Sequence, residues 1–113
     1  MQELICVDGK FSAEFLDFYA KHGVSVPVEG KLYNPRSVNK NSNGEWEILL
    51  VEIINPEVPI KHKILGIGYK EPAWRLSRFA KIDGTQISLE EVIELKKELK
   101  LVEQWFYQNI RNL

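Results

Sequence analysis

Between residues 30 and 83, short apolar runs are separated by turn residues at close intervals. Runs of this length and spacing are typical of short β-strands joined by tight turns. The clearest pair is 31–39 with 45–54, joined by a polar loop that contains Asn43-Gly44, a dipeptide that readily adopts positive φ. The segment therefore predicts a small antiparallel β-structure, which we expect to close into a barrel of about five strands.

Two features of this strand pair limit how regular it can be. Pro35 either makes 31–39 an edge strand or breaks it, because proline donates no ladder hydrogen bond. In 45–54 apolar and polar residues alternate at first, but from Leu49 onward apolar residues fall on both faces. Either a β-bulge shifts the facing or both faces are covered. We favour cover of both faces, because a long helix follows and needs a surface to lie on.

The later part of the segment carries weaker strand signals. The composition of 55–59, with two prolines, predicts a loop, and 64–69 predicts a strand that its two glycines would kink. Residues 74–81 predict a short turn and a last strand, which closes at Asp83-Gly84.

The first 29 residues predict one strand and one helix. Residues 4–7 form a short apolar run that ends at a turn pair. Ser12 suits the N-cap of a helix, aromatic residues follow at helical spacing, and Gly23 suits the left-handed position after the last turn. We therefore expect a helix over about 13–22.

The strongest local signal is helical and covers 89–113. Ser88 and Glu91 form a capping box, in which each side chain accepts a hydrogen bond from a free backbone N–H at the helix start. At 1.5 Å per residue this helix would be about 37 Å long, so we expect part of it to extend beyond a small barrel. Its apolar stripe is Val92, Leu95, Leu99, Val102, Phe106, Ile110 and Leu113.

The whole chain has the length and composition of one globular domain. It has 113 residues, of which 44% are hydrophobic and 27% are charged. No apolar run approaches the roughly 20 residues that span a bilayer, and the N-terminus lacks the pattern of a secretory signal. Cys6 is the only cysteine, so no internal disulfide can form. We expect a cytoplasmic protein without membrane contact.

Charge is unevenly distributed along the chain. The formal net charge is −1, but residues 30–81 hold 9 basic and 5 acidic side chains, a balance of +4. This balance falls well short of a dedicated basic stripe, so a solvated surface is the simpler interpretation. A weak nucleic-acid surface is the alternative, and its candidate residues are Lys31, Arg36, Lys61, Lys63, Arg75 and Arg78.

Several short motifs stand out between residues 30 and 79. They are Gly30-Lys31-Leu32-Tyr33, Arg36-Ser37-Val38, Ile48-Leu49-Leu50-Val51-Glu52-Ile53, Glu71-Pro72-Ala73-Trp74 and Ser77-Arg78-Phe79. This pattern resembles small SH3-like barrel proteins encoded in phages and mobile elements of gut bacteria, a group without an assigned function. The resemblance covers roughly residues 4–83, and Asn34-Pro35 departs from the β-branched residues expected there. It implies an SH3-like fold and a phage or mobile-element setting, and it brings no catalytic residues.

No motif in the chain specifies a reaction. Cys6 with His22 or His62 could pair a nucleophile with a base, but Cys6 lies inside an apolar run, where a buried core residue is the simpler interpretation. Glu45 and Glu47 share a strand face, yet no second catalytic group accompanies them. We therefore expect no catalytic, cofactor-binding or metal-binding residues and no small-molecule substrate.

Two clusters are candidate contact surfaces. Aromatic residues beside arginines, from Trp74 to Phe79, could bind bases or a peptide. The simpler interpretation makes these aromatic residues part of the core and leaves Arg75 and Arg78 exposed. Near the chain end three consecutive aromatic residues cannot all face one stripe, so either association or intramolecular packing explains them. The candidate partner-binding residues there are Trp105, Phe106, Tyr107, Ile110 and Leu113.

These patterns together predict a single α+β domain over 1–113. We expect an SH3-like barrel over about 1–86, which includes the first helix, and a long C-terminal amphipathic helix packed along it. The leading hypothesis is a non-enzymatic interaction module of phage or mobile-element origin, which binds a protein partner or forms a homodimer through this helix. Weak nucleic-acid binding is second, and an enzyme of unidentifiable class is third.

Overall fold

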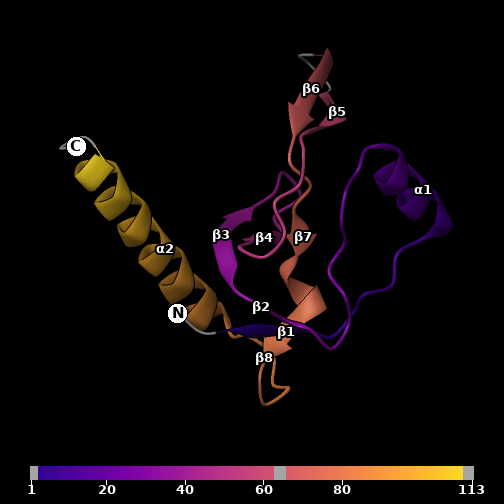
Figure 1. Cartoon of the computed structure of the whole chain (residues 1–113). Helices are drawn as coiled ribbons and strands as arrows, with labels where there is room; N and C mark the ends of the chain where they lie inside the picture. Colours follow the sequence, from indigo (N-terminus) through magenta and orange to yellow (C-terminus); the bar gives the residue numbers. More distant parts are fainter. Residues whose placement is uncertain (1–2, 63–65, 111–113) are drawn as a thin grey trace.

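The computed structural model describes residues 3–62 and 66–110 and shows a mixed α+β chain (Figure 1). The described residues form two α-helices, eight short strands and one 3-10 turn. In chain order these elements are β1 (Leu4–Cys6), α1 (Ala13–Lys21), β2 (Leu32–Tyr33), β3 (Pro35–Lys40), β4 (Trp46–Leu50), β5 (Val58–His62), β6 (Gly66–Lys70), β7 (Trp74–Arg75), η1 (Leu76–Arg78), β8 (Phe79–Lys81) and α2 (Leu89–Ile110).

The strands form three small antiparallel sheets. Their strand orders are β2-β1-β8, β3-β4-β7 and β5-β6. Within the described ranges no sheet closes on itself. The predicted α+β class is therefore confirmed, whereas the barrel is not confirmed.

The predicted strand 31–39 is broken next to its proline. β2 pairs with β1, and after Asn34 the chain changes sheets, so that β3 begins at Pro35 and pairs with β4. The Asn34 N–H donates to the Glu52 carboxylate, and the Asn34 carbonyl accepts from the Val51 N–H at 2.8 Å. These bonds satisfy the backbone where the strand ladder is interrupted.

The expected cover of both faces of the 45–54 strand is wrong at its far end. β4 ends at Leu50, and Val51 follows in a bend where its side chain is half exposed. The irregularity lies on the neighbouring strand, where the β3–β4 register shifts between Pro35 and Ser37. A bulge on a partner strand leaves no direct mark in the sequence of β4.

A hairpin occupies the region where a loop was predicted. β5 begins at Val58 and pairs with β6 without interruption, from Val58↔Lys70 to His62↔Gly66. The loop prediction for 58–59 is therefore wrong, because a two-stranded sheet consists of edge strands and an edge strand tolerates Pro59. The strand predicted over 64–69 is confirmed from Gly66 onward, and its first two residues lie outside the described ranges.

Both helices begin at the predicted caps. The Ser12 Oγ accepts a hydrogen bond from the Phe15 N–H at 3.3 Å, and α1 ends at Lys21, before Gly23 with φ of 68°. At the start of α2 the Ser88 N–H donates to Glu91 at 3.1 Å, and the Glu91 N–H donates to Ser88 at 3.2 Å. The capping box is confirmed.

The core lies between the two three-stranded sheets and the first turns of α2. Ten buried side chains from β1, β2, β3, β4, β7, η1, β8 and α2 form one cluster. They are Leu4, Cys6, Tyr33, Val38, Ile48, Leu50, Trp74, Leu76, Phe79 and Val92.

Candidate interaction surface

The apolar side chains of α2 are buried at its start and exposed further along, both on the stripe and beside it. Val92 is 3% exposed, whereas Leu101 is 64%, Val102 55% and Trp105 64% exposed. Because an α-helix has 3.6 residues per turn, these three exposed residues cover roughly 100° of its circumference. We call Leu101, Val102 and Trp105 the distal face of α2.

The second half of α2 extends beyond the strand on which the helix packs (Figure 1). α2 packs on β3, and Leu95 and Leu99 are partly buried against the core cluster. Figure 1 shows the carboxyl-terminal half of α2 leaning away from β3. The overhang expected from helix length is therefore present in the described residues, and it carries apolar side chains into solvent.

A groove of about 650 Å³ opens between the second half of α2 and β3. We call it the α2–β3 groove. Its apolar lining comes from both elements and from the bend after β4, while its charged side chains are mostly basic. The apolar residues are Pro35, Val38, Val51, Leu99 and Val102, and the charged ones are Arg36, Lys96, Lys100 and Glu103.

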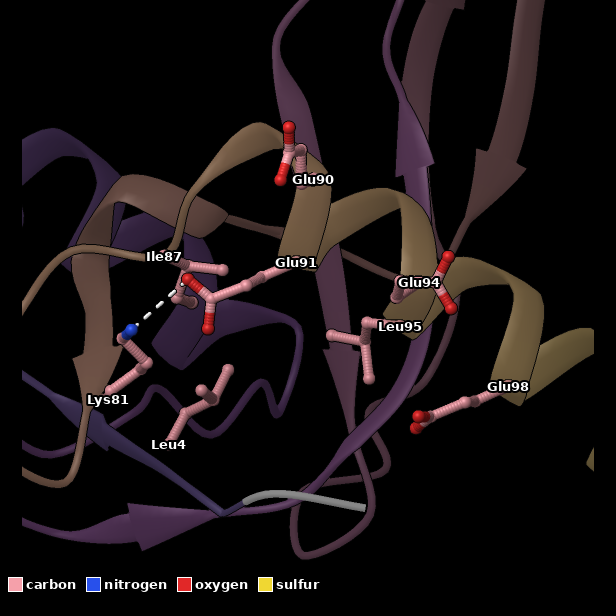
Figure 2. A pocket seen from close by; sticks show the side chains of 8 residues that line it. All are labelled: Leu4, Lys81, Ile87, Glu90, Glu91, Glu94, Leu95 and Glu98. Carbon is pink, nitrogen blue, oxygen red and sulfur yellow. Dashed lines mark hydrogen bonds and ion pairs between the residues drawn. The ribbon is translucent and has the colours of Figure 1, made fainter.

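A second groove, of about 580 Å³, lies beside another face of α2 (Figure 2). Leu4 and Leu95 contribute apolar surface, and glutamates of α2 surround it. Glu91 forms an ion pair with Lys81, with 3.1 Å between Oε1 and Nζ. The hydrogen bond from the Ser88 N–H, together with this lysine, holds the pKa of Glu91 below its usual range. This carboxylate therefore stabilises the start of α2.

The structure describes only part of the predicted partner-binding cluster. Trp105 is exposed on the distal face of α2. Phe106, Tyr107 and Ile110 belong to α2, but their side chains lie outside the described part of the structure, and so does all of Leu113. Sequence reasoning missed Leu101, whose exposure follows from the overhang and from its place off the main stripe.

The candidate arginines of the nucleic-acid surface each contact a carboxylate on a different part of the molecule. Arg36 contacts Glu71 at 2.6 Å and donates from Nε to the Leu50 carbonyl at 3.0 Å. Arg75 contacts Glu45 at 3.2 Å.

Arg78 contacts Asp8 at 3.4 Å and lies 3.9 Å from the ring centre of Phe11. Lys31, just before β2, and Lys61, on β5, are exposed, and Lys63 lies outside the described residues. The structure therefore gathers no continuous basic surface from the described candidates.

The aromatic residues beside these arginines belong to the core. Trp74 and Phe79 are buried, so the simpler interpretation of this cluster is confirmed for both. The rings of Phe11 and Tyr19 meet Trp74 edge-on, each at 5.6 Å between ring centres. Burial raises the pKa of Tyr19. These contacts hold α1 against the sheet that contains β7.

Of the residues weighed for catalysis, Cys6, Glu45 and Glu47 occupy structural positions. Cys6 is buried, and burial raises the pKa of its thiol, the opposite of what a thiolate nucleophile requires. Glu45 is paired with Arg75, and Glu47 lies 3.8 Å from Lys70. The side chain of His62 lies outside the described part of the structure.

One exposed surface was not found from sequence. On β6, Ile67 is 70% and Tyr69 67% exposed, and the two residues point to the same face of the hairpin. The alternation of Ile67 and Tyr69 with glycines was the available signal. This pattern predicts a kinked strand and does not indicate which face is covered.

Comparison with known proteins does not identify the chain. No protein family, curated protein or solved structure gives a significant match. No helix within 3–62 or 66–110 is long and apolar enough to cross a membrane. The same residues contain no group of three or more histidine, cysteine, aspartate or glutamate side chains placed to hold a metal ion. The exposed surfaces are therefore the features of the molecule that bear on its function.

Proposed function

We propose that this chain is a non-enzymatic interaction module that associates with a second copy of itself through the distal face of α2. One observation carries the proposal: the second half of α2 exposes three apolar side chains, Leu101, Val102 and Trp105, outside the surface on which the helix packs. The resemblance to SH3-like proteins of phages and mobile elements supports a module of that origin, and an SH3-like relation between the two three-stranded sheets is part of the same proposal.

Burial of the distal face would stabilise a complex. Fully burying a leucine or valine side chain contributes about 1.5–3 kcal/mol relative to leaving it in water. Leu101, Val102 and Trp105 are each more than half exposed, so most of this contribution is available for a contact. Contiguous apolar patches of this kind mark interaction sites more often than isolated exposed residues do.

A second copy fits the distal face because it presents the same apolar side chains. A twofold contact places Leu101, Val102 and Trp105 of one copy against those of the other, so both apolar surfaces leave water together. Lys96, Lys100 and Glu103 line the α2–β3 groove, on the other side of the helix from Leu101 and Trp105.

The proposal is tested by the solution mass of a double variant. Leu101→Glu with Val102→Glu places charges on the distal face, and we expect the mass measured by light scattering to fall. Both side chains are exposed in the monomer, so the fold should persist, as judged by the near-ultraviolet signal of buried Trp74.

Ile93→Glu is the matched control, since Ile93 is also exposed on α2 but lies away from the distal face. Its mass should equal that of the unmodified protein. A double variant of unchanged mass, or an unmodified protein that is monomeric at every concentration, would overturn the proposal. A monomer that binds an added amphipathic helix would assign the distal face to a different protein.

A further inference from the structure

The β5–β6 hairpin projects from the rest of the protein (Figure 1). Its two strands form a sheet of their own, and no other described strand pairs with either of them. An isolated two-stranded hairpin is only marginally stable in water. Each of its strands also presents a row of backbone groups that another strand can pair with. The hairpin is therefore an element that gains stability from an added strand.

The two edges of the hairpin differ. β5 contains Pro59, which has no backbone N–H, and the exposed Lys61. Proline and lysine are the residues that protect an edge strand from further pairing. β6 has no proline, and it carries Ile67 and Tyr69 exposed on one face, with Gly68 between them. β6 is the open edge.

β6 is complementary to itself in one antiparallel register. When two copies of the five-residue strand overlap fully, Gly68 lies opposite Gly68 of the second copy. Ile67 then lies opposite Tyr69, twice, on the same face of the joined sheet. A pair of an aromatic and a β-branched residue is one of the favourable cross-strand contacts, each contributing roughly 0.2–1 kcal/mol.

The charges of β6 are compatible with this register. Lys70 lies opposite Gly66 of the second copy, so the two lysines sit at opposite ends of the strand pair. A parallel alignment in register would place Lys70 beside Lys70, which is unfavourable. Lys70 also lies 3.8 Å from Glu47 at the base of the hairpin, which partly balances its charge.

We propose that β6 pairs with β6 of a second copy, in antiparallel register centred on Gly68, to form a four-stranded sheet. The contact is twofold symmetric, because the same five residues act on both sides. Pro59 and Lys61 then occupy both outer edges, so that the sheet ends at four strands. This contact is separate from the distal face of α2 and goes beyond the function proposed above.

The register predicts a pattern of charge substitutions. In a background of Leu101→Glu with Val102→Glu, which blocks the α2 contact, we expect a dimer. Adding Ile67→Lys with Tyr69→Lys places like charges opposite one another and should give a monomer. Adding Ile67→Lys with Tyr69→Glu places lysine opposite glutamate and should restore the dimer. Light scattering and sedimentation measure all of these masses.

Ile82→Lys is the control, because Ile82 is an exposed apolar residue in the turn after β8, and β8 lies at the other end of the molecule from the hairpin (Figure 1). It should leave the dimer unchanged. The inference is overturned if the variant with Leu101→Glu and Val102→Glu is already monomeric. It is also overturned if adding Ile67→Lys with Tyr69→Lys leaves that variant dimeric. A lysine–glutamate variant as monomeric as the lysine pair would overturn it too, since only the proposed register pairs those charges.

The test separates the two proposals. If the α2 substitutions leave the mass of the unmodified protein unchanged, the α2 proposal fails, while the comparison of the two hairpin variants still decides the β6 contact. If the hairpin variants leave the mass unchanged, the β6 contact fails and the α2 proposal stands on its own measurement.

Discussion

Arg36 shows how one side chain can hold together segments that are far apart in the chain. It lies at the register shift of β3, and its guanidinium reaches the Leu50 carbonyl at 3.0 Å and Glu71 at 2.6 Å. Glu71 also accepts from the Asn55 N–H at 3.1 Å. The rigid, planar guanidinium can serve two acceptors at once, which a lysine ammonium on a flexible stem cannot do with the same geometry.

Arg36→Lys should therefore destabilise the protein although it keeps the charge. Hydrogen bonds to charged groups contribute about 1.5–3 kcal/mol, and partial exposure of this pair places the expected loss near the lower end, about 1–2 kcal/mol. Urea unfolding measures this change in the free energy of unfolding.

The matched control is Arg75→Lys. Arg75 forms a more exposed ion pair with Glu45, so its replacement should change stability by less than about 0.5 kcal/mol. Equal losses for Arg36→Lys and Arg75→Lys would show that the contacts of Arg36 across the strands carry no special weight.

At the scale of elements, the sequence predicts structure where a local interaction decides it. The capping box of Ser88 and Glu91 involves four neighbouring residues, and α2 begins where predicted. The end of β4 depends on a bulge in another strand, and β5 depends on pairing with β6 that outweighs the composition of 55–59. Exposure of Val102, a residue of the apolar stripe, depends on where the surface beneath α2 ends, which no local pattern contains.

The stability that Glu91 contributes at the start of α2 should depend on pH. The pKa of Glu91 is lowered, first by the hydrogen bond from the Ser88 N–H, so folding favours the charged carboxylate. In the unfolded chain the pKa of a glutamate is about 4.3, and in the folded protein the pKa of Glu91 is lower. The carboxylate therefore stabilises the fold fully above about pH 4.3, and this contribution is lost as pH falls through the pKa of the folded protein. Glu91→Gln should therefore be less stable than the unmodified protein at neutral pH, and the gap should close below about pH 4.

Urea midpoints measured from neutral pH downward test this expectation. Glu94→Gln is the control, since Glu94 is an exposed residue of α2 that forms an exposed ion pair with Lys97 at 3.6 Å. A gap between Glu91→Gln and the unmodified protein that stays constant on acidification would contradict a charge-dependent cap.

At the scale of the whole molecule, the two proposed contacts lie on different elements, α2 and β6 (Figure 1). Each contact is twofold symmetric, so a chain that carries both can join one copy through α2 and another through β6. Copies would then alternate between the two contacts in an extended assembly, or in a ring with an even number of copies. A module of this kind acts as a scaffold whose length depends on concentration.

A chain blocked at one contact should stop such an assembly. The variant with Leu101→Glu and Val102→Glu can still pair through β6 but offers no α2 contact, so each added copy ends one assembly. We expect the average mass of the unmodified protein to fall steadily as this variant is added. The variant that also carries Ile67→Lys and Tyr69→Lys cannot join at either contact and should leave the mass unchanged at equal concentration. If the two variants act alike, the alternating assembly is wrong even where one contact exists, because a protein with a single contact has no chain to stop.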